Sequence, residues 1–194
     1  MRLPEDRTMT ELEHLLRVVV SKPDCQDAWL AVADGLDRHG VPGRAELLRL
    51  HRLLLSTCCE PDRHPERRGW HARLVELLAH GVRPCVPHRA VPLGGGVNMA
   101  FHLVPPGAFL MGSPSGEAER RDDEARHRVT LTAALWLGTG PVTQAQWRAV
   151  LGHNPSRFAG DGHPVETVSW DDCVAFCRRL GRKVGRPCRL PTEA

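Results

Sequence analysis

The chain has 194 residues, of which 41% are hydrophobic and 25% charged, and its formal net charge is +3. This composition excludes a collagen-like or intrinsically disordered chain. Basic residues outnumber acidic ones only slightly in both halves, 14 to 13 before Asn98 and 12 to 10 from there on, so we expect no nucleic-acid partner.

The N-terminus, MRLPEDRTMTELEHLL, mixes both signs of charge and lacks the apolar run of a secretory signal. No segment reaches the roughly 18 to 20 apolar residues that cross a bilayer. Seven cysteines, an odd number, are typical of reduced thiols in a chain of this size. These features predict a cytoplasmic protein without a membrane segment.

Two helices are predicted at the start of the chain. Thr10 and Glu13 have the spacing of a capping box, and leucine and valine residues recur behind them at helical intervals. Pro23 and Asp24 separate this helix from a second one, which ends near Gly40.

Two more helices follow, the third marked by leucines at positions 47, 50 and 54 and the fourth running from about Trp70 to Gly81. Residues 1–80 are therefore predicted to form a small all-α module. Residues 12–55 resemble the short repeat-companion domain that precedes other modules in some large bacterial proteins, and this resemblance implies no chemistry. The matching positions are Pro23, Asp24, Leu30, Ala33, Asp34, Leu36, Gly40, Arg44, Ala45, Glu46 and Arg49.

Asp34 and Glu46 admit two interpretations. They could act as a paired acid and base, or they could be helix-face carboxylates that pair with the nearby Arg44 and Arg49. Because the sequence shows no pocket around them, the structural interpretation is favoured.

Residues 81–97 are rich in Pro and Gly and show no hydrophobic period, which predicts a linker between two domains. Strands are predicted after it, at Phe101–Val104, at Phe109–Met111 and, as one long strand, at His127–Leu137.

Two helices with strong start signals complete the chain. Thr143 with Gln146, and Ser169 with Asp172, have the spacing of capping boxes. The buried stripe of the second helix is predicted to consist of Cys173, Phe176, Cys177 and Leu180. Strands alternating with helices predict an α+β domain over residues 98–194.

Seven motifs occur in order through this second half. They are MGS at 111–113, His127 before VTLT, WLG at 136–138, VTQAQW at 142–147, NPSRF at 154–158, PVETVSW at 164–170 and RLPTEA at 189–194. Together they resemble the front part of the formylglycine-generating enzyme (sulfatase-modifying factor) family. Leu135 and Pro141 stand where that family usually has Phe and Glu.

The resemblance implies an irregular α+β fold similar to C-type lectin domains. A complete member uses oxygen and Cu(I), held by two thiolates, to convert a cysteine of a protein substrate into formylglycine. In the family these cysteines follow RLPTEA. We therefore assign no catalytic, cofactor-binding or metal-binding residue in this chain, and we expect an incomplete domain that is inactive alone. The alternative is a non-catalytic, lectin-like protein-binding module.

The cysteines that are present admit a second interpretation. Cys173 and Cys177 are one helical turn apart and could share a soft metal with Cys188 or His163, although packing in the core is favoured. Cys58 and Cys59 are interpreted as spectator thiols. A run of basic residues at the end of the last helix also has two interpretations. Solvated arginines at a helix end are favoured, and anion binding is the alternative. The run consists of Arg178, Arg179, Arg182, Lys183, Arg186 and Arg189.

Within the predicted linker, Cys85, Pro87 and Arg89 spell Cys-x-Pro-x-Arg, the pattern that formylglycine-generating enzymes recognise in sulfatases. A chance match is favoured, and the alternative hypothesis is that this exposed loop is, or mimics, a substrate of a complete enzyme.

An incomplete domain should also expose apolar surface. We expect Trp136, Trp147 and Trp170 to be exposed and to promote self-association.

Overall fold

The computed structural model describes residues 5–57, 64–113 and 116–192 of the chain. The chain divides into two compact units, one formed by Met1–Pro87 with Val104–Leu135 and the other by His88–Leu103 with Trp136–Ala194. One division, between residues 87 and 88, falls inside the predicted linker. The fold is α+β, as the sequence predicts.

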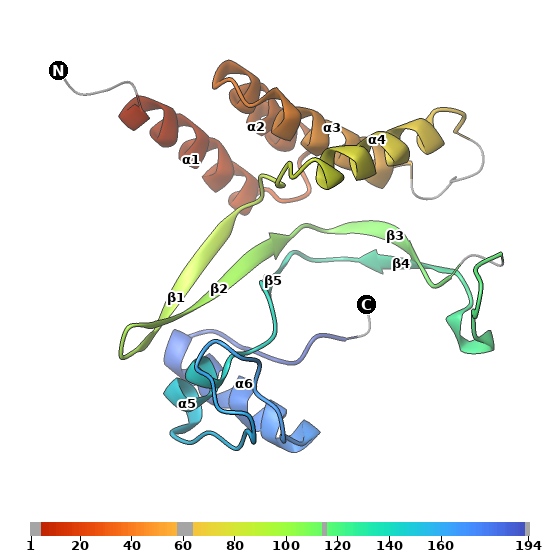
Figure 1. The fold of residues 1–194 in the computed structure, drawn as a ribbon. Coiled ribbons are helices and arrows are strands. Elements are labelled where there is room, and N and C mark those ends of the chain that lie inside the picture. Colours follow the sequence, from red (N-terminus) through yellow and green to blue (C-terminus); the bar gives the residue numbers. More distant parts are fainter. Residues whose placement is uncertain (1–4, 58–63, 114–115, 193–194) are drawn as a thin grey trace. The chain divides into compact units, whose positions relative to one another are not determined.

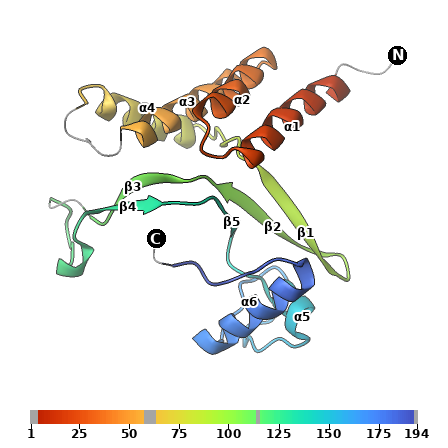
Figure 2. The ribbon, with the colours of Figure 1, turned by 180° about the vertical axis from the view of Figure 1, so that it is seen from behind.

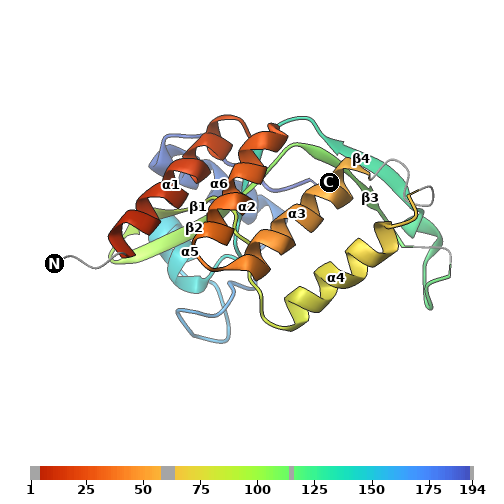
Figure 3. The ribbon, with the colours of Figure 1, turned by 90° about the horizontal axis from the view of Figure 1, so that it is seen from above.

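Four helices make up most of the first unit and confirm the predicted helical start of the chain. They are α1 (Glu5–Ser21), α2 (Gln26–Arg38), α3 (Pro42–Ser56) and α4 (Arg67–Ala79). Each helix packs against the next one along the chain, and Figure 3 shows α1 to α4 in that order. Because α1 begins at Glu5, Thr10 lies inside the helix and the predicted capping box at its start is wrong.

Aliphatic and aromatic side chains at helical spacing build the core of this unit. Trp29 is 2% exposed, and its indole N–H donates to the Pro23 carbonyl at 2.9 Å, which satisfies its polar edge. The other fully buried large residues here are Val19, Val32 and Leu36. This unit also contains the antiparallel pair β3 (Gly107–Met111) and β4 (His127–Leu131).

The second unit contains a sheet with the order β1–β2–β5, formed by His88–Gly94, Val97–Val104 and Leu135–Gly138. The prediction of a structureless linker is therefore wrong for residues 88–94. Pro92 obscured the signal, but proline is tolerated here because β1 is an edge strand. Leu93 and Met99 point to the same buried side of the sheet, as strand alternation requires.

The single strand predicted over His127–Leu137 is also wrong, because the segment forms two strands in different sheets. β4 pairs with β3, whereas β5 pairs with β2. Alternating hydrophobicity can indicate that a segment is extended, but it cannot indicate which partner each part of it finds.

Helices α5 (Gln144–Leu151) and α6 (Trp170–Val184) lie side by side below this sheet in Figures 1 and 2. Both predicted capping boxes are confirmed, at Thr143 with Gln146 and at Ser169 with Asp172. The rings of Trp147 and Phe176 stack at 5.1 Å between centroids and 4° between planes. They form the core of the unit with Leu93, Met99 and Leu180.

The end of α6 is fixed by a tight reversal of the backbone. Gly185 adopts a φ of +68°, and the Arg186 N–H donates to the Gly181 carbonyl at 3.1 Å, as in a Schellman motif. A Cβ atom at Gly181 would lie 2.9 Å from the Arg186 carbonyl oxygen and 3.2 Å from the Cys188 nitrogen. The segment after α6 can pack this closely only because residue 181 has no side chain.

No helix in the described ranges has both the length and the apolar character needed to cross a membrane.

A Gly181→Ala substitution tests this close approach. Alanine favours a helix by about 1 kcal/mol over glycine, but the clash is with backbone atoms that cannot rotate away, so we expect a net loss of about 1 to 3 kcal/mol. Gly69→Ala in α4 is the matched control, since a Cβ there meets nothing within 4 Å, and it should not destabilise. Urea unfolding of both variants measures the difference, and equal midpoints would contradict the steric argument.

Candidate functional site

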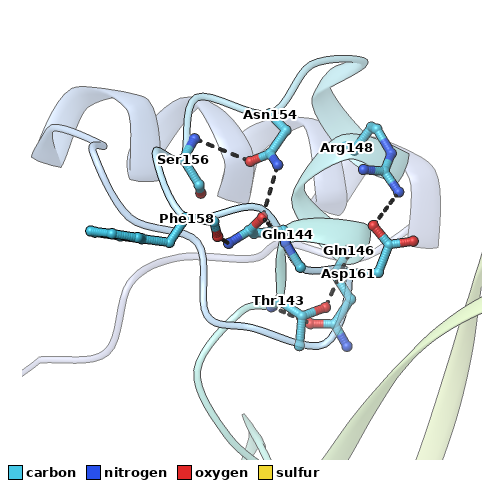
Figure 4. A network of polar contacts seen from close by, with 9 residues as sticks. Thr143, Gln144, Gln146, Arg148, Asn154, Ser156, Phe158 and Asp161 are labelled. Atoms are coloured by element: carbon cyan, nitrogen blue, oxygen red, sulfur yellow. Dashed lines mark hydrogen bonds and ion pairs between the residues drawn. The ribbon is translucent and has the colours of Figure 1, made fainter.

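The side chain of Gln144 in the second unit is 1% exposed. Several polar groups of the loop after α5 form hydrogen bonds with it. Its amide group donates to the carbonyl oxygens of Phe158 at 2.8 Å and of Pro164 at 3.3 Å. Its amide oxygen accepts from the Asn154 side chain at 2.9 Å and from the Gly160 backbone at 3.0 Å. All the hydrogen-bonding capacity of this buried side chain is used, and Figure 4 shows its bonds to Asn154 and Phe158.

Backbone contacts fasten the same loop to the start of α5. The Gln144 N–H donates to the His163 carbonyl at 2.9 Å, and the Ala145 N–H donates to the Asp161 carbonyl at 3.1 Å. The Asp161 carboxylate also pairs with Arg148 at 2.8 Å. The first turn of α5 thus uses its free N–H groups to hold the returning loop.

A second anchor is Glu166, whose carboxylate accepts hydrogen bonds from the Thr167 hydroxyl and from the backbone N–H groups of Arg157 and Phe158. These bonds hold the pKa of Glu166 below its usual range, and the bond from Thr167 contributes most to this shift. Thr167 itself has a φ of +60°, a strained value for a β-branched residue. The carboxylate therefore fixes residues 157 and 158 of the loop, and Gln144 binds the carbonyl of the same Phe158.

Two aromatic side chains are exposed on this framework. Phe158 is 75% exposed and Trp170 is 69% exposed, and the Phe158 ring points away from the polar network in Figure 4. The expectation of an exposed Trp147 is wrong, because its ring is stacked in the core and only 2% exposed. Trp136 is partly buried.

The structure does not place Cys85 in an exposed loop. Its side chain is 5% exposed, and burial raises the pKa of its thiol. Arg44 fixes the preceding segment by donating to the carbonyl oxygens of Arg83 at 3.0 Å and Pro84 at 3.2 Å. Pro87 is buried as well, so the predicted exposure of this motif is wrong.

Arg89, the third residue of the motif, lies in β1. Its guanidinium carbon is 4.2 Å from the centroid of the Trp136 ring and 6.0 Å from that of Phe101. These cation–π contacts draw the side chain onto the sheet rather than into solvent.

The carboxylates in the helical unit have structural partners. Asp34 pairs with Arg49 at 2.6 Å and Glu46 pairs with Arg73 at 2.7 Å. The structural interpretation is therefore confirmed, although Arg44 is not among these partners.

The cysteines of the second unit pack against its core. Cys173 and Cys177 contact the buried cluster, as the predicted apolar stripe requires, and Cys188 contacts it as well. Burial raises the pKa of Cys177 and of Cys188. Within the described ranges, no three His, Cys, Asp or Glu side chains come together as a metal site. Cys58 and Cys59 lie outside the described residues.

Sequence reasoning used Gln144, Asn154 and Glu166 only as letters of motifs and missed their role. The available signal was that each is a polar residue inside one of the motifs VTQAQW, NPSRF and PVETVSW. Local pattern rules assign a cap or a turn to such residues. In the structure, their side chains instead form hydrogen bonds with groups that lie 8 to 20 positions away in the sequence.

Comparison with known proteins identifies a family. The model of a family described as "Sulfatase-modifying factor enzyme 1-like domain" matches residues 97–194. The chain is 48% identical over 49 residues to a protein of Paenibacillus barcinonensis named Chaperone protein LppX, covering 25% of this chain and 17% of that protein.

Two further relatives are named formylglycine-generating enzymes. The mouse protein is 41% identical over 68 residues, which cover 35% of this chain and 16% of that protein. The protein of Streptomyces coelicolor is 33% identical over 101 residues, which cover 51% of this chain and 24% of that protein. The matched part of this chain thus spans less than a quarter of the length of each relative.

Replacing Gln144 by Leu should destabilise the second unit by about 2 to 4 kcal/mol, because several buried polar groups lose their partner at once. Gln146→Leu is the matched control: it removes a part-buried capping contact and a bond to the Asn98 carbonyl, and it should cost less, about 1 kcal/mol. Urea unfolding followed by tryptophan fluorescence measures both losses. A Gln144→Leu variant as stable as the control would show that the network does not hold the loop.

The burial of Cys85 predicts slow chemistry at its thiol. At pH 8, iodoacetamide should alkylate Cys85 at least about tenfold more slowly than the half-buried Cys25, since the thiolate is the reactive form and access is restricted. Peptide mapping by mass spectrometry follows each site over time. Equal rates at the two cysteines would restore the exposed-loop hypothesis.

Proposed function

Because the chain belongs to the sulfatase-modifying factor enzyme 1-like family, we propose that residues 97–194 form part of a domain that converts a cysteine of a protein substrate into formylglycine. The observation that carries this proposal is the fully bonded network around Gln144. Its members come from the motifs VTQAQW, NPSRF and PVETVSW, the same motifs on which the resemblance rests. A degenerate copy of the domain would lose such a network first, because one missing partner leaves several buried groups unsatisfied.

The described thiols do not fit the Cu(I) ion that the family implies. Cu(I) requires deprotonated sulfur ligands, whereas partial burial raises the pKa of Cys177 and of Cys188 and favours their neutral thiols. We therefore propose that these thiols serve packing and that this chain alone does not oxidise a substrate cysteine. The free cysteines are consistent with a reducing compartment such as the cytoplasm.

Two measurements test the proposal with one substrate, a fluorescent peptide that contains Cys-x-Pro-x-Arg. Anisotropy should show saturable binding that weakens when the peptide's Pro and Arg are replaced by Ala. Incubation with Cu(I), oxygen and a thiol reductant should leave the mass of the peptide unchanged.

The outcomes separate the two parts of the proposal. Equal or absent binding of both peptides would overturn the assignment of this chain to formylglycine chemistry. Conversion of the cysteine by the chain alone would support that assignment and overturn the proposed inactivity.

A further inference from the structure

An open hollow of about 360 Å³ lies at the end of α6. Its lining consists of Cys177, Arg178, Gly181, Arg182, Arg186, Pro187 and Cys188. Three of these seven residues are arginines and none is acidic. Its volume is within the range of small-ligand sites, and the glycine-dependent reversal at Gly181 gives it its shape.

The lining arginines have no ionic partner among the described residues. In the described part of the chain, no carboxylate pairs with Arg178, Arg182 or Arg186, whereas Arg148 and Arg73 each pair with an acidic side chain. All three lining arginines are exposed, so their donors face solvent or a ligand. The carboxyl end of a helix carries about half a negative charge. The positive charge of the three guanidinium groups is larger, so the hollow has a net positive charge.

A fourth arginine lies close to this hollow. The charges of Arg186 and Cys188 both act on Arg89, whose guanidinium is held in place by stacking on Trp136. The Arg89 Nε atom is buried and has no hydrogen-bond partner. Burial and the like charge of Arg186 both lower the pKa of Arg89, burial more. Two neighbouring guanidinium groups with unused donors and no carboxylate between them repel each other unless an anion joins them.

We propose that this hollow binds a small tetrahedral oxyanion of the phosphate or sulfate class, with Arg186 and Arg182 as the main donors and Arg89 beside them. Guanidinium groups bind such anions through two parallel N–H donors, which a fixed, stacked arginine offers without further loss of side-chain freedom. This inference goes beyond the proposed function, because it assigns a ligand site away from the cysteine chemistry and does not depend on it.

The test is a titration of the full chain with inorganic phosphate and with sulfate, against sodium chloride at equal ionic strength. Two-dimensional ¹H–¹⁵N NMR should show saturable shifts at the backbone amides of residues 185, 186 and 188. Arg186→Gln and Arg89→Gln should each weaken phosphate binding by about tenfold, the loss expected when one charged hydrogen-bonding partner is removed.

Arg179→Gln is the matched control, since Arg179 is an exposed residue of α6 outside the hollow and its loss should change the affinity less than about twofold. If Arg89→Gln fails to fold, Arg182→Gln replaces it, because Arg182 is exposed on the helix. Equal shifts with chloride, or an equal loss for Arg179→Gln and Arg186→Gln, would overturn the site.

Discussion

The second unit depends on a single buried amide. Gln144 sits in the first turn of α5, where its position is set by the capping box of the preceding residue, and its side chain satisfies donors and acceptors from a loop of more than ten residues. Leaving one of these groups unpaired in the interior would cost more than a single hydrogen bond contributes, so the arrangement is held or lost as a whole. Trp147 lies on the same helix, and its ring stacks on Phe176 of α6.

This dependence ties three motif residues to the scaffold. Gln144 and Glu166 bond to backbone groups of the loop between α5 and α6, and Asn154 bonds to the Gln144 side chain. Motifs of this type report that a scaffold is intact. Cys177 and Cys188 belong to the same scaffold, because both pack against its apolar cluster.

The parts of the fold that were predictable from sequence are those fixed by local interactions. The capping boxes at Thr143 and Ser169 need only three residues' separation, and helical spacing marks the first four helices well. The strand β1 was missed because Pro92 and the neighbouring glycines resemble a loop until their partner β2 is known. Arg89 could not be placed on Trp136, 47 positions away, by any local rule, and the burial of Cys85 could not be predicted from the Pro-rich segment around it.

The position of β1 has a consequence for how this module can move between genes. The family match begins at Val97, yet the folded unit begins at His88 and includes an edge strand that supplies Leu93 to the core. A recombination event that joins foreign sequence at residue 97 would transfer every recognisable motif but leave the edge of the sheet without its strand. The segment that the family model matches and the segment that folds together therefore differ at this edge, because β1 lies outside the match.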